Sequence, residues 1–223
     1  MIIEYKQDPF SRFYQADQSG VTKYTNGEYV YIPILKNAHT WLTQIFRDGL
    51  GWEPVLDPAD ISHCKKIVVL RDPIERWISA MATYLDFLDG LMQLDSSTVQ
   101  LICDGVFYDQ HTLPQTLSLG GLDTEYCVFF YMSKHTNDFD INMKNFITDR
   151  FKKIDYGMFT KNDGLNKPKH KYYNEQFSKL LARLEGSVFQ RKLYHAYLSD
   201  YHLLESLKLE KNKHKECYEN FNC

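Results

Sequence analysis

The chain has no long apolar run, no pair of closely spaced cysteines and no excess of basic residues. No stretch approaches the ~20 apolar residues that cross a bilayer, and residues 1–6 lack the basic and then apolar pattern of a secretory signal. The five cysteines are scattered without Cys-x-x-Cys spacing, so no metal site is predicted. A net charge of −3 argues against a general nucleic-acid binder. These absences favour a soluble, cytoplasmic protein that has no membrane span and does not bind nucleic acid.

Glycine is missing where a loop that binds ATP or GTP would need it. No glycine lies between Ile32 and Arg47, so this part of the chain has no Gly-x-x-x-x-Gly-Lys-Ser/Thr loop. The absence lowers the expectation that the protein uses ATP or GTP.

Charge is unevenly distributed along the chain. Residues 86–140 carry nine acidic side chains and one basic side chain, whereas residues 149–171 carry seven basic and three acidic side chains. The basic segment would help to hold an anionic ligand. The alternative is that both segments are solvated faces.

The hydrophobic pattern predicts strands that alternate with helices. Apolar, β-branched and aromatic runs predict strands at 29–34, 66–70 and 125–132, and helical periodicity predicts helices at 39–48, 73–88, 96–103, 140–147, 174–184 and 187–207. A loop is expected over 52–64 and a short edge strand within 151–159. This alternation predicts an α/β fold with a central parallel sheet flanked by helices. The 223 residues are expected to form one domain, with an N-terminal arm or hairpin over 1–27 and a polar tail over 208–223.

Two segments read as a strand, a tight turn and the start of a helix. They run from Ile32 to Trp41 and from Ile67 to Ser79, and both place cationic or hydroxyl side chains after the strand. Anionic ligands bind where the carboxyl end of a parallel strand meets a helix N-terminus. Two such places suggest a ligand with two separated phosphate-like groups.

These motifs resemble the sulfotransferases that use 3′-phosphoadenosine 5′-phosphosulfate (PAPS), and in particular their carbohydrate-type branch. The resemblance spans roughly residues 29–207, and it lies in Lys36-Asn37-Ala38-His39-Thr40-Trp41, in the Arg-Asp-Pro-x-x-Arg-x-x-Ser pattern of 71–79, in the His-x-x-Pro-Gln pattern of 111–115 and in 197–204. It implies a three-layer, P-loop-like domain. It also implies that PAPS is the donor and that adenosine 3′,5′-bisphosphate (PAP) is the product.

The resemblance assigns a role to each motif. The 5′-phosphosulfate would be held by Lys36, Asn37, Ala38, His39 and Thr40, with Trp41 on the adenine side. Arg71 and Ser79 would hold the 3′-phosphate. Asn166, Lys167 and Lys171 belong to a polar loop that resembles the family's late segment over the cofactor. The alternative for this loop is a solvated basic surface.

Sulfuryl transfer requires a cation at the donor and a base at the acceptor. A lysine directed at the bridging oxygen of the leaving phosphate stabilises negative charge that develops in the transition state, which suits Lys36. A neutral imidazole near pH 7 can accept the acceptor's proton, which suits His111. Asp109 or Gln115 would orient that ring, and His39 is the competing base. Arg76 is expected to be structural, in an ion pair or on the helix surface.

The sequence therefore predicts transfer of a sulfuryl group from PAPS to a hydroxyl of a glycan or small molecule. Two alternatives stay open: a kinase-like phosphotransferase, and a non-catalytic module that binds nucleotide or a protein partner. The acidic segment predicts a neutral or cationic acceptor. The animal enzymes of this branch are anchored in the Golgi membrane, and the absence of an anchor here suggests an enzyme of a bacterium or virus. The pairing of Cys217 with Cys223 and the oligomeric state stay open.

Overall fold

The computed structural model describes residues 21–87, 110–133, 138–159 and 168–209 of the chain. The described residues divide into two compact units, with one formed from 21–71, 117–133 and 138–159 and the other from 72–87, 110–116 and 168–209. Each unit has its own hydrophobic core. The predicted helix at 96–103 lies outside the described residues.

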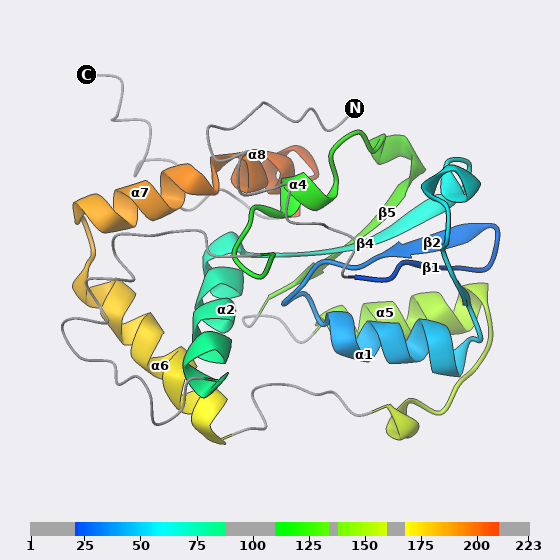
Figure 1. The fold of residues 1–223 in the computed structure, drawn as a ribbon, viewed down its shortest axis with the longest axis horizontal. Coiled ribbons are helices and arrows are strands. Elements are labelled where there is room, and N and C mark those ends of the chain that lie inside the picture. The colour runs from blue at the N-terminus through cyan, green and yellow to red at the C-terminus, as the bar shows by residue number, and fades with distance from the viewer. Residues whose placement is uncertain (1–20, 88–109, 134–137, 160–167, 210–223) are drawn as a thin grey trace. The chain divides into compact units, whose positions relative to one another are not determined.

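The first unit is an α/β arrangement built on a five-stranded sheet (Figure 1). Its elements are β1 (Tyr24–Thr25), β2 (Tyr29–Ile32), α1 (His39–Gln44), the π-helical turn η3 (Ile45–Gly49), β3 (Glu53–Pro54), the 3₁₀ turn η4 (Pro58–Ile61), β4 (Lys65–Arg71), the 3₁₀ turn η5 (Thr124–Tyr126), β5 (Cys127–Met132), α5 (Asp138–Arg150) and the 3₁₀ turn η6 (Tyr156–Met158). The strand order is β3-β1-β2-β4-β5. The predicted strands at 29–34, 66–70 and 125–132 correspond to β2, β4 and β5.

The sheet is mixed, which corrects the prediction of a parallel sheet. β2, β4 and β5 are parallel, but β1 is antiparallel to both β2 and β3. The cause is the tight turn after β1, where Gly27 has a φ of 88° and the Asn26 side chain accepts hydrogen bonds from the amides of Glu28 and Tyr29. So short a connection can only join antiparallel strands. β1 and β2 form a hairpin, and β3 lies in the stretch predicted to be a loop. Residues 1–20 of the expected N-terminal arm lie outside the described residues.

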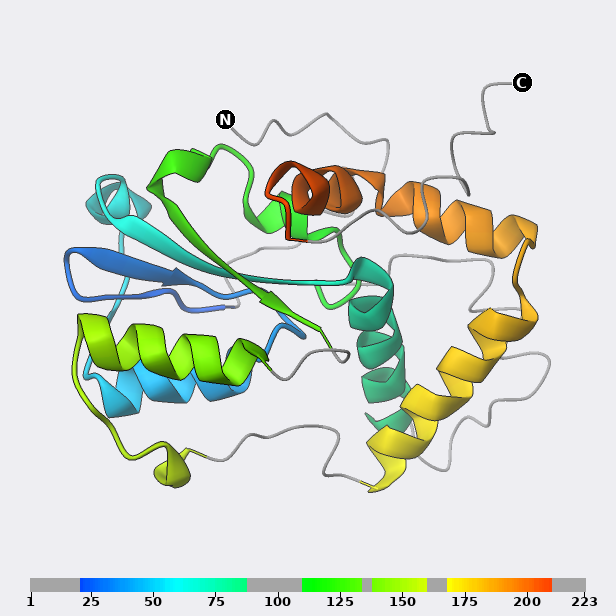
Figure 2. The same cartoon turned by 180° about the vertical axis from the view of Figure 1, so that it is seen from behind.

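Helices α1 and α5 cover the same face of this sheet. Trp41 of α1 meets Phe139 of α5 edge to face, with ring centroids 6.3 Å apart. In Figure 2, α5 lies in front of α1 along one side of the sheet. Tyr31, Ile67 and other alternate strand residues point into this core, as the two-residue period of a strand requires. The strand residues between them, such as Val30 and Val68, are buried too.

The predicted edge strand at 151–159 is wrong. This stretch is irregular and contains η6, whose first amides are capped because the Asp155 carboxylate accepts from the amide of Gly157. Phe151, Ile154 and Phe159 pack their side chains against the core instead. A capped turn in the middle of the segment prevents the extended backbone that a strand needs.

The second unit is helical. It contains α2 (Pro73–Phe87), α6 (Pro168–Arg183), α7 (Val188–Ala196), α8 (Leu198–Ser206) and the first half of α4 (Gln115–Ser118). Asp72 accepts from the amide of Glu75 at 2.7 Å and Pro73 follows it, so these two residues start α2 as an N-cap and a first-turn proline. Trp77 of α2 meets Phe177 of α6 in the core. The one long helix predicted over 187–207 is two helices, which break at Tyr197.

Each core contains a buried tyrosine, and the two differ in whether the hydroxyl makes a hydrogen bond. Tyr31 is 1% exposed and its hydroxyl makes no hydrogen bond, whereas Tyr197 is 0% exposed and its hydroxyl donates to the Thr112 carbonyl. Burial raises the pKa of Tyr31 well above its ordinary range. Since an unsatisfied buried hydroxyl costs free energy, Tyr31→Phe should leave the free energy of unfolding unchanged or raise it. Tyr197→Phe should lower it by about 1–3 kcal/mol, because the carbonyl loses its donor. Urea unfolding of both variants measures this, and equal losses would contradict it.

Candidate functional site

The predicted phosphosulfate loop is a tight turn at the carboxyl end of β2. The amide of Asn37 donates to the Ile34 carbonyl at 3.2 Å, and the amide of Leu42 donates to the Ala38 carbonyl as α1 begins. Lys36 has a φ of 69° and Ala38 a φ of 57°, both left-handed, whereas Asn37 between them does not have a positive φ. A left-handed residue other than glycine is uncommon and costs about 1–2 kcal/mol. The rest of the unit must therefore hold this turn in place.

Two side chains fasten the turn to β4, the next strand of the sheet. Asn37 is 0% exposed, and its Nδ2 donates to the Val69 carbonyl at 2.8 Å. Arg71 lies at the end of β4, and its Nη1 donates to the Lys36 carbonyl at 3.1 Å. The structure therefore places the Arg71 guanidinium against the backbone of Lys36, although the sequence predicted these residues for two different motifs.

The geometry of this turn suits an anion. Consecutive backbone N–H groups in a turn of alternating handedness form a concave site for phosphate-like groups. Lys36 and Arg71 add positive charge beside it, and an arginine fork matches phosphate oxygens. Thr40 is exposed, and its Oγ1 lies 3.3 Å from Nδ1 of His39. The backbone of the turn, the Lys36 cation and the Thr40 hydroxyl could therefore hold a phosphosulfate.

Trp41 occupies the core of the first unit. Its indole is buried and contacts Phe139, so packing accounts for this side chain. An adenine-side role for it stays a prediction.

Ser79 lies in the second turn of α2, half-buried, in the second unit. The hydroxyl of Thr83 donates to the Ser79 carbonyl at 3.0 Å, and the same hydroxyl lies 3.1 Å from Nε2 of His170 in α6. His170 is buried, and its Nδ1 lies 2.8 Å from the side-chain amide of Asn174. The turn that carries Ser79 is thus connected to the first turn of α6, a connection that the sequence did not predict.

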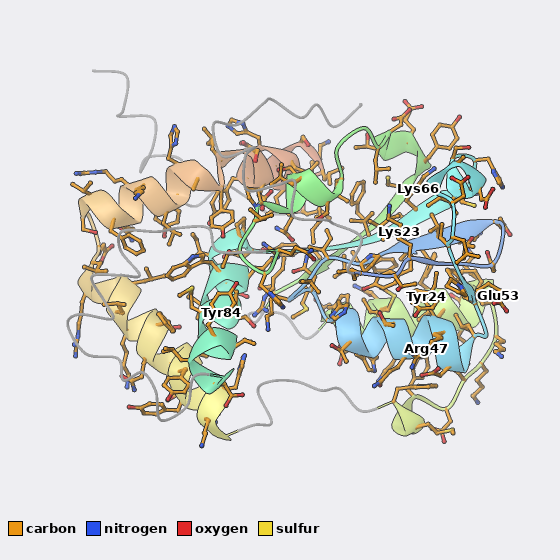
Figure 3. The ribbon with its side chains drawn as sticks, viewed as in Figure 1. Lys23, Tyr24, Arg47, Glu53, Lys66 and Tyr84 are labelled. Atoms are coloured by element: carbon orange, nitrogen blue, oxygen red, sulfur yellow. The ribbon has the colours of Figure 1, made fainter. Side chains whose placement is uncertain are left out.

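His111 lies in the second unit on the segment before α4. Its ring is half-buried and meets the ring of Tyr84, with centroids 6.0 Å apart and planes at 83°. Tyr84 projects from α2 (Figure 3). Gln115, predicted to orient His111, is buried and donates through Nε2 to the Asp200 carboxylate at 3.3 Å.

Arg76 was expected in an ion pair or on the helix surface, and the structure buries it. It is 1% exposed rather than on the helix surface, and its guanidinium donates to the carbonyls of Gln110 and Leu113. Because a charged group is seldom fully buried unless it is paired or hydrogen-bonded, its burial marks the segment it contacts as important to the unit. The structural role expected for Arg76 is thus present, whereas sequence reasoning gave Tyr197 and Asp200 no role of their own within the 197–204 motif.

Of the remaining predicted residues, only Lys171 lies within the described part of the chain. Lys171 is exposed in the first turn of α6. Asn166, Lys167 and Asp109 lie outside the described residues, as do Cys217 and Cys223.

Cys127 at the start of β5 is a poor nucleophile. Its thiol donates to the Asp123 carbonyl at 3.2 Å, and burial raises the pKa of Cys127 to about 11, against the smaller lowering by Lys66. Lys66 lies on β4 (Figure 3), and its ammonium donates to the Ser62 carbonyl. Cys127 therefore acts as part of the strand rather than as a reactive group.

Comparison of the chain with protein-family models, with curated proteins and with solved structures found no match. Within the described residues, none of the helices has both the length and the apolar content that a membrane crossing requires.

Substitutions in the turn test what holds it. Asn37→Ala should lower the free energy of unfolding by about 1–3 kcal/mol, because the buried Val69 carbonyl loses its donor. Ala38→Gly should not destabilise the protein, because glycine adopts a left-handed φ without steric cost. Thermal and urea unfolding of both variants provide the measurement. A strongly destabilised Ala38→Gly variant would contradict the left-handed assignment.

Alkylation tests the environment of Cys127. A pKa of about 11 in place of 9.0 leaves a thiolate fraction about 100-fold smaller near pH 8. Iodoacetamide should therefore label Cys127 slowly at pH 8 and faster as the pH approaches 11 in the folded protein, as followed by peptide mass spectrometry. Labelling in urea at pH 8 serves as the control and should be fast. Rapid labelling of the native protein at pH 8 would contradict the burial of the thiol.

Proposed function

We propose that the chain is a PAPS-dependent sulfotransferase that moves a sulfuryl group to a hydroxyl of a sugar or another small molecule. The observation that carries the proposal is the left-handed turn at Lys36 and Ala38, fastened to β4 by Asn37 and by Arg71. Two motifs 35 residues apart in the sequence meet there, and both carry positive charge. A ligand with two anionic groups would require two positively charged motifs near each other.

In this proposal the turn binds the 5′-phosphosulfate. Its backbone N–H groups and the Thr40 hydroxyl hold the equatorial oxygens. The Lys36 ammonium acts on the bridging oxygen, where negative charge grows as the sulfur–oxygen bond to phosphate breaks. Lys36 thus lowers the barrier rather than only improving binding. His39 lies beside Thr40 in the first turn of α1 and contributes to the same group.

The 3′-phosphate distinguishes PAPS from ADP and ATP, and Arg71 and Ser79 are proposed to bind it. A guanidinium offers parallel donors to two phosphate oxygens. Asn166, Lys167 and Lys171 add contacts on this side of the nucleotide, with Trp41 on the adenine side. The finer architecture that goes with this proposal is a three-layer, P-loop-like domain.

His111 is proposed as the general base. The acceptor's hydroxyl oxygen attacks sulfur as its proton passes to the imidazole. The new oxygen–sulfur bond forms while the bond from sulfur to the bridging oxygen breaks, and PAP leaves with that electron pair. A neutral imidazole accepts such a proton near pH 7. The acidic balance of residues 86–140 favours a neutral or cationic acceptor over a polyanionic glycan, and a cytoplasmic location is part of the proposal.

Calorimetry with PAP tests the proposal directly. The native protein should bind PAP and discriminate against ADP and 5′-AMP, because only PAP carries a 3′-phosphate. Arg71→Ala should weaken binding by about 10- to 100-fold, the loss expected for a charge-assisted hydrogen-bonded contact. Lys36→Asn should also weaken it, and asparagine tolerates the left-handed backbone at this position.

The matched control is Arg47→Ala. Arg47 is an exposed arginine of the same unit that pairs with Asp48 at 2.6 Å, so its loss should leave PAP binding unchanged. Equal affinity for PAP and ADP would overturn the sulfotransferase proposal in favour of a kinase-like phosphotransferase. PAP binding without sulfate transfer to any hydroxyl, together with no effect of His111→Ala, would favour a non-catalytic nucleotide-binding module.

A further inference from the structure

The segment from Gln110 to Thr116 is held in place by side chains from distant parts of the second unit. Arg76 of α2 donates to the Gln110 carbonyl at 2.9 Å and to the Leu113 carbonyl. The Tyr197 hydroxyl, at the break between α7 and α8, donates to the Thr112 carbonyl. Three carbonyls within four residues thus accept from two buried donors.

The end of the segment is held from α8 by a carboxylate. Asp200 accepts from the backbone amides of Gln115 at 2.8 Å and Thr116 at 2.9 Å, and also from the Thr116 hydroxyl at 3.0 Å. Ser199 lies 2.9 Å from that hydroxyl. Asp200 thereby caps α4, whose first amides have no partner within the helix.

All three anchoring side chains are removed from water. Arg76 and Asp200 are each 1% exposed and Tyr197 is 0% exposed. Burial raises the pKa of Asp200, while the hydrogen bonds from Thr116 and Gln115 and the charge of Arg76 act in the opposite direction. Burying such groups is unfavourable unless each finds partners. Here the partners are backbone atoms of one short irregular segment.

His111 lies inside the anchored stretch. The carbonyls of Gln110 and Thr112, on either side of it, are both bound. Fixing the backbone on both sides fixes the direction in which the His111 side chain leaves the chain. The ring is then held from one side by Tyr84 of α2.

We infer that Arg76, Tyr197 and Asp200 are positioning residues that set the orientation of the His111 ring. They act through the backbone of the segment and do not contact the acceptor, because they are buried. The inference rests on the proposed function in one respect, because that function makes the His111 ring the general base. The orientation itself can be measured without any acceptor. The rate of proton transfer falls steeply when the base is displaced by a small distance. An anchored His111 ring would therefore favour that step.

The central experiment uses Tyr197→Phe, which removes one oxygen from the anchoring set and keeps the ring in the core. Tyr31→Phe is its matched control, because it removes a similarly buried hydroxyl that makes no hydrogen bond. Arg76→Lys and Asp200→Asn remove part of the other two anchors while conserving size. Circular dichroism and unfolding first establish that each variant folds.

Two readouts report on the segment. Hydrogen exchange by mass spectrometry follows the Gln115 and Thr116 amides, and NMR follows the Cε1 proton of His111, assigned with His111→Gln. In Tyr197→Phe the exchange should rise by about 10-fold or more, and the His111 resonance should move or broaden. Tyr31→Phe should leave both unchanged. A folded Tyr197→Phe variant with native exchange and a native His111 resonance overturns the inference.

Turnover separates this inference from the proposed function. With PAPS and a hydroxyl acceptor, Tyr197→Phe should lower kcat by about 10-fold while the KM for PAPS stays constant, since a positioning residue affects the step and not the binding of the donor. If kcat is unchanged and kcat/KM falls by the same factor because the KM for PAPS rises, the positioning role is overturned. Failure of the native protein to bind PAP overturns the proposed function instead. The exchange and NMR results then still decide whether these residues orient His111.

Discussion

The parallel pairing of β2 with β4 is the interaction on which the candidate anion site depends. Ile32 pairs with Val68, so the two strands end in the same direction, and the chain leaving β2 passes the last residues of β4. Asn37 and Arg71 then need to reach only across neighbouring strands to bind the backbone at Val69 and Lys36. These contacts offset the cost of two left-handed residues that are not glycine. Without the pairing, neither the turn nor the contact of Arg71 with the Lys36 backbone would exist.

Buried polar side chains that fix an irregular segment occur in both units. In the first unit, Asn37 satisfies a strand carbonyl and fixes a turn. In the second, Arg76 and Asp200 satisfy the segment around His111 from two different helices. A loop that must keep one conformation cannot rely on regular hydrogen bonding, so its backbone groups need partners from elsewhere. The positions of these side chains therefore indicate which irregular segments the fold specifies most closely.

The sequence predicted the parts of the fold that depend on local pattern. The strands β2, β4 and β5 are continuous apolar runs, and α2 begins at a recognisable Asp-Pro pair, so both could be found. It missed β3, which is two residues long and pairs only through β1, and the break at Tyr197, which has neither proline nor glycine to mark it. The loop with Lys36 and the segment with His111 were found from motifs. Their anchors were not, because Tyr197 and Asp200 lie more than 80 residues from the atoms they bind.

An arginine binds carbonyls in both the turn at Lys36 and the segment from Gln110 to Thr116, but only the second also receives an anion from the protein. At α4 the protein supplies its own anion, since the Asp200 carboxylate already accepts from the amides of Gln115 and Thr116. A bound phosphate would have to displace a buried carboxylate there and would be repelled by it. At the turn after β2 the group supplied by the neighbouring strand is a cation, Arg71, and it binds a carbonyl rather than an amide. In the proposed function the turn therefore favours an external anion, whereas the segment that carries His111 is stabilised by the protein's own Arg76, Tyr197 and Asp200.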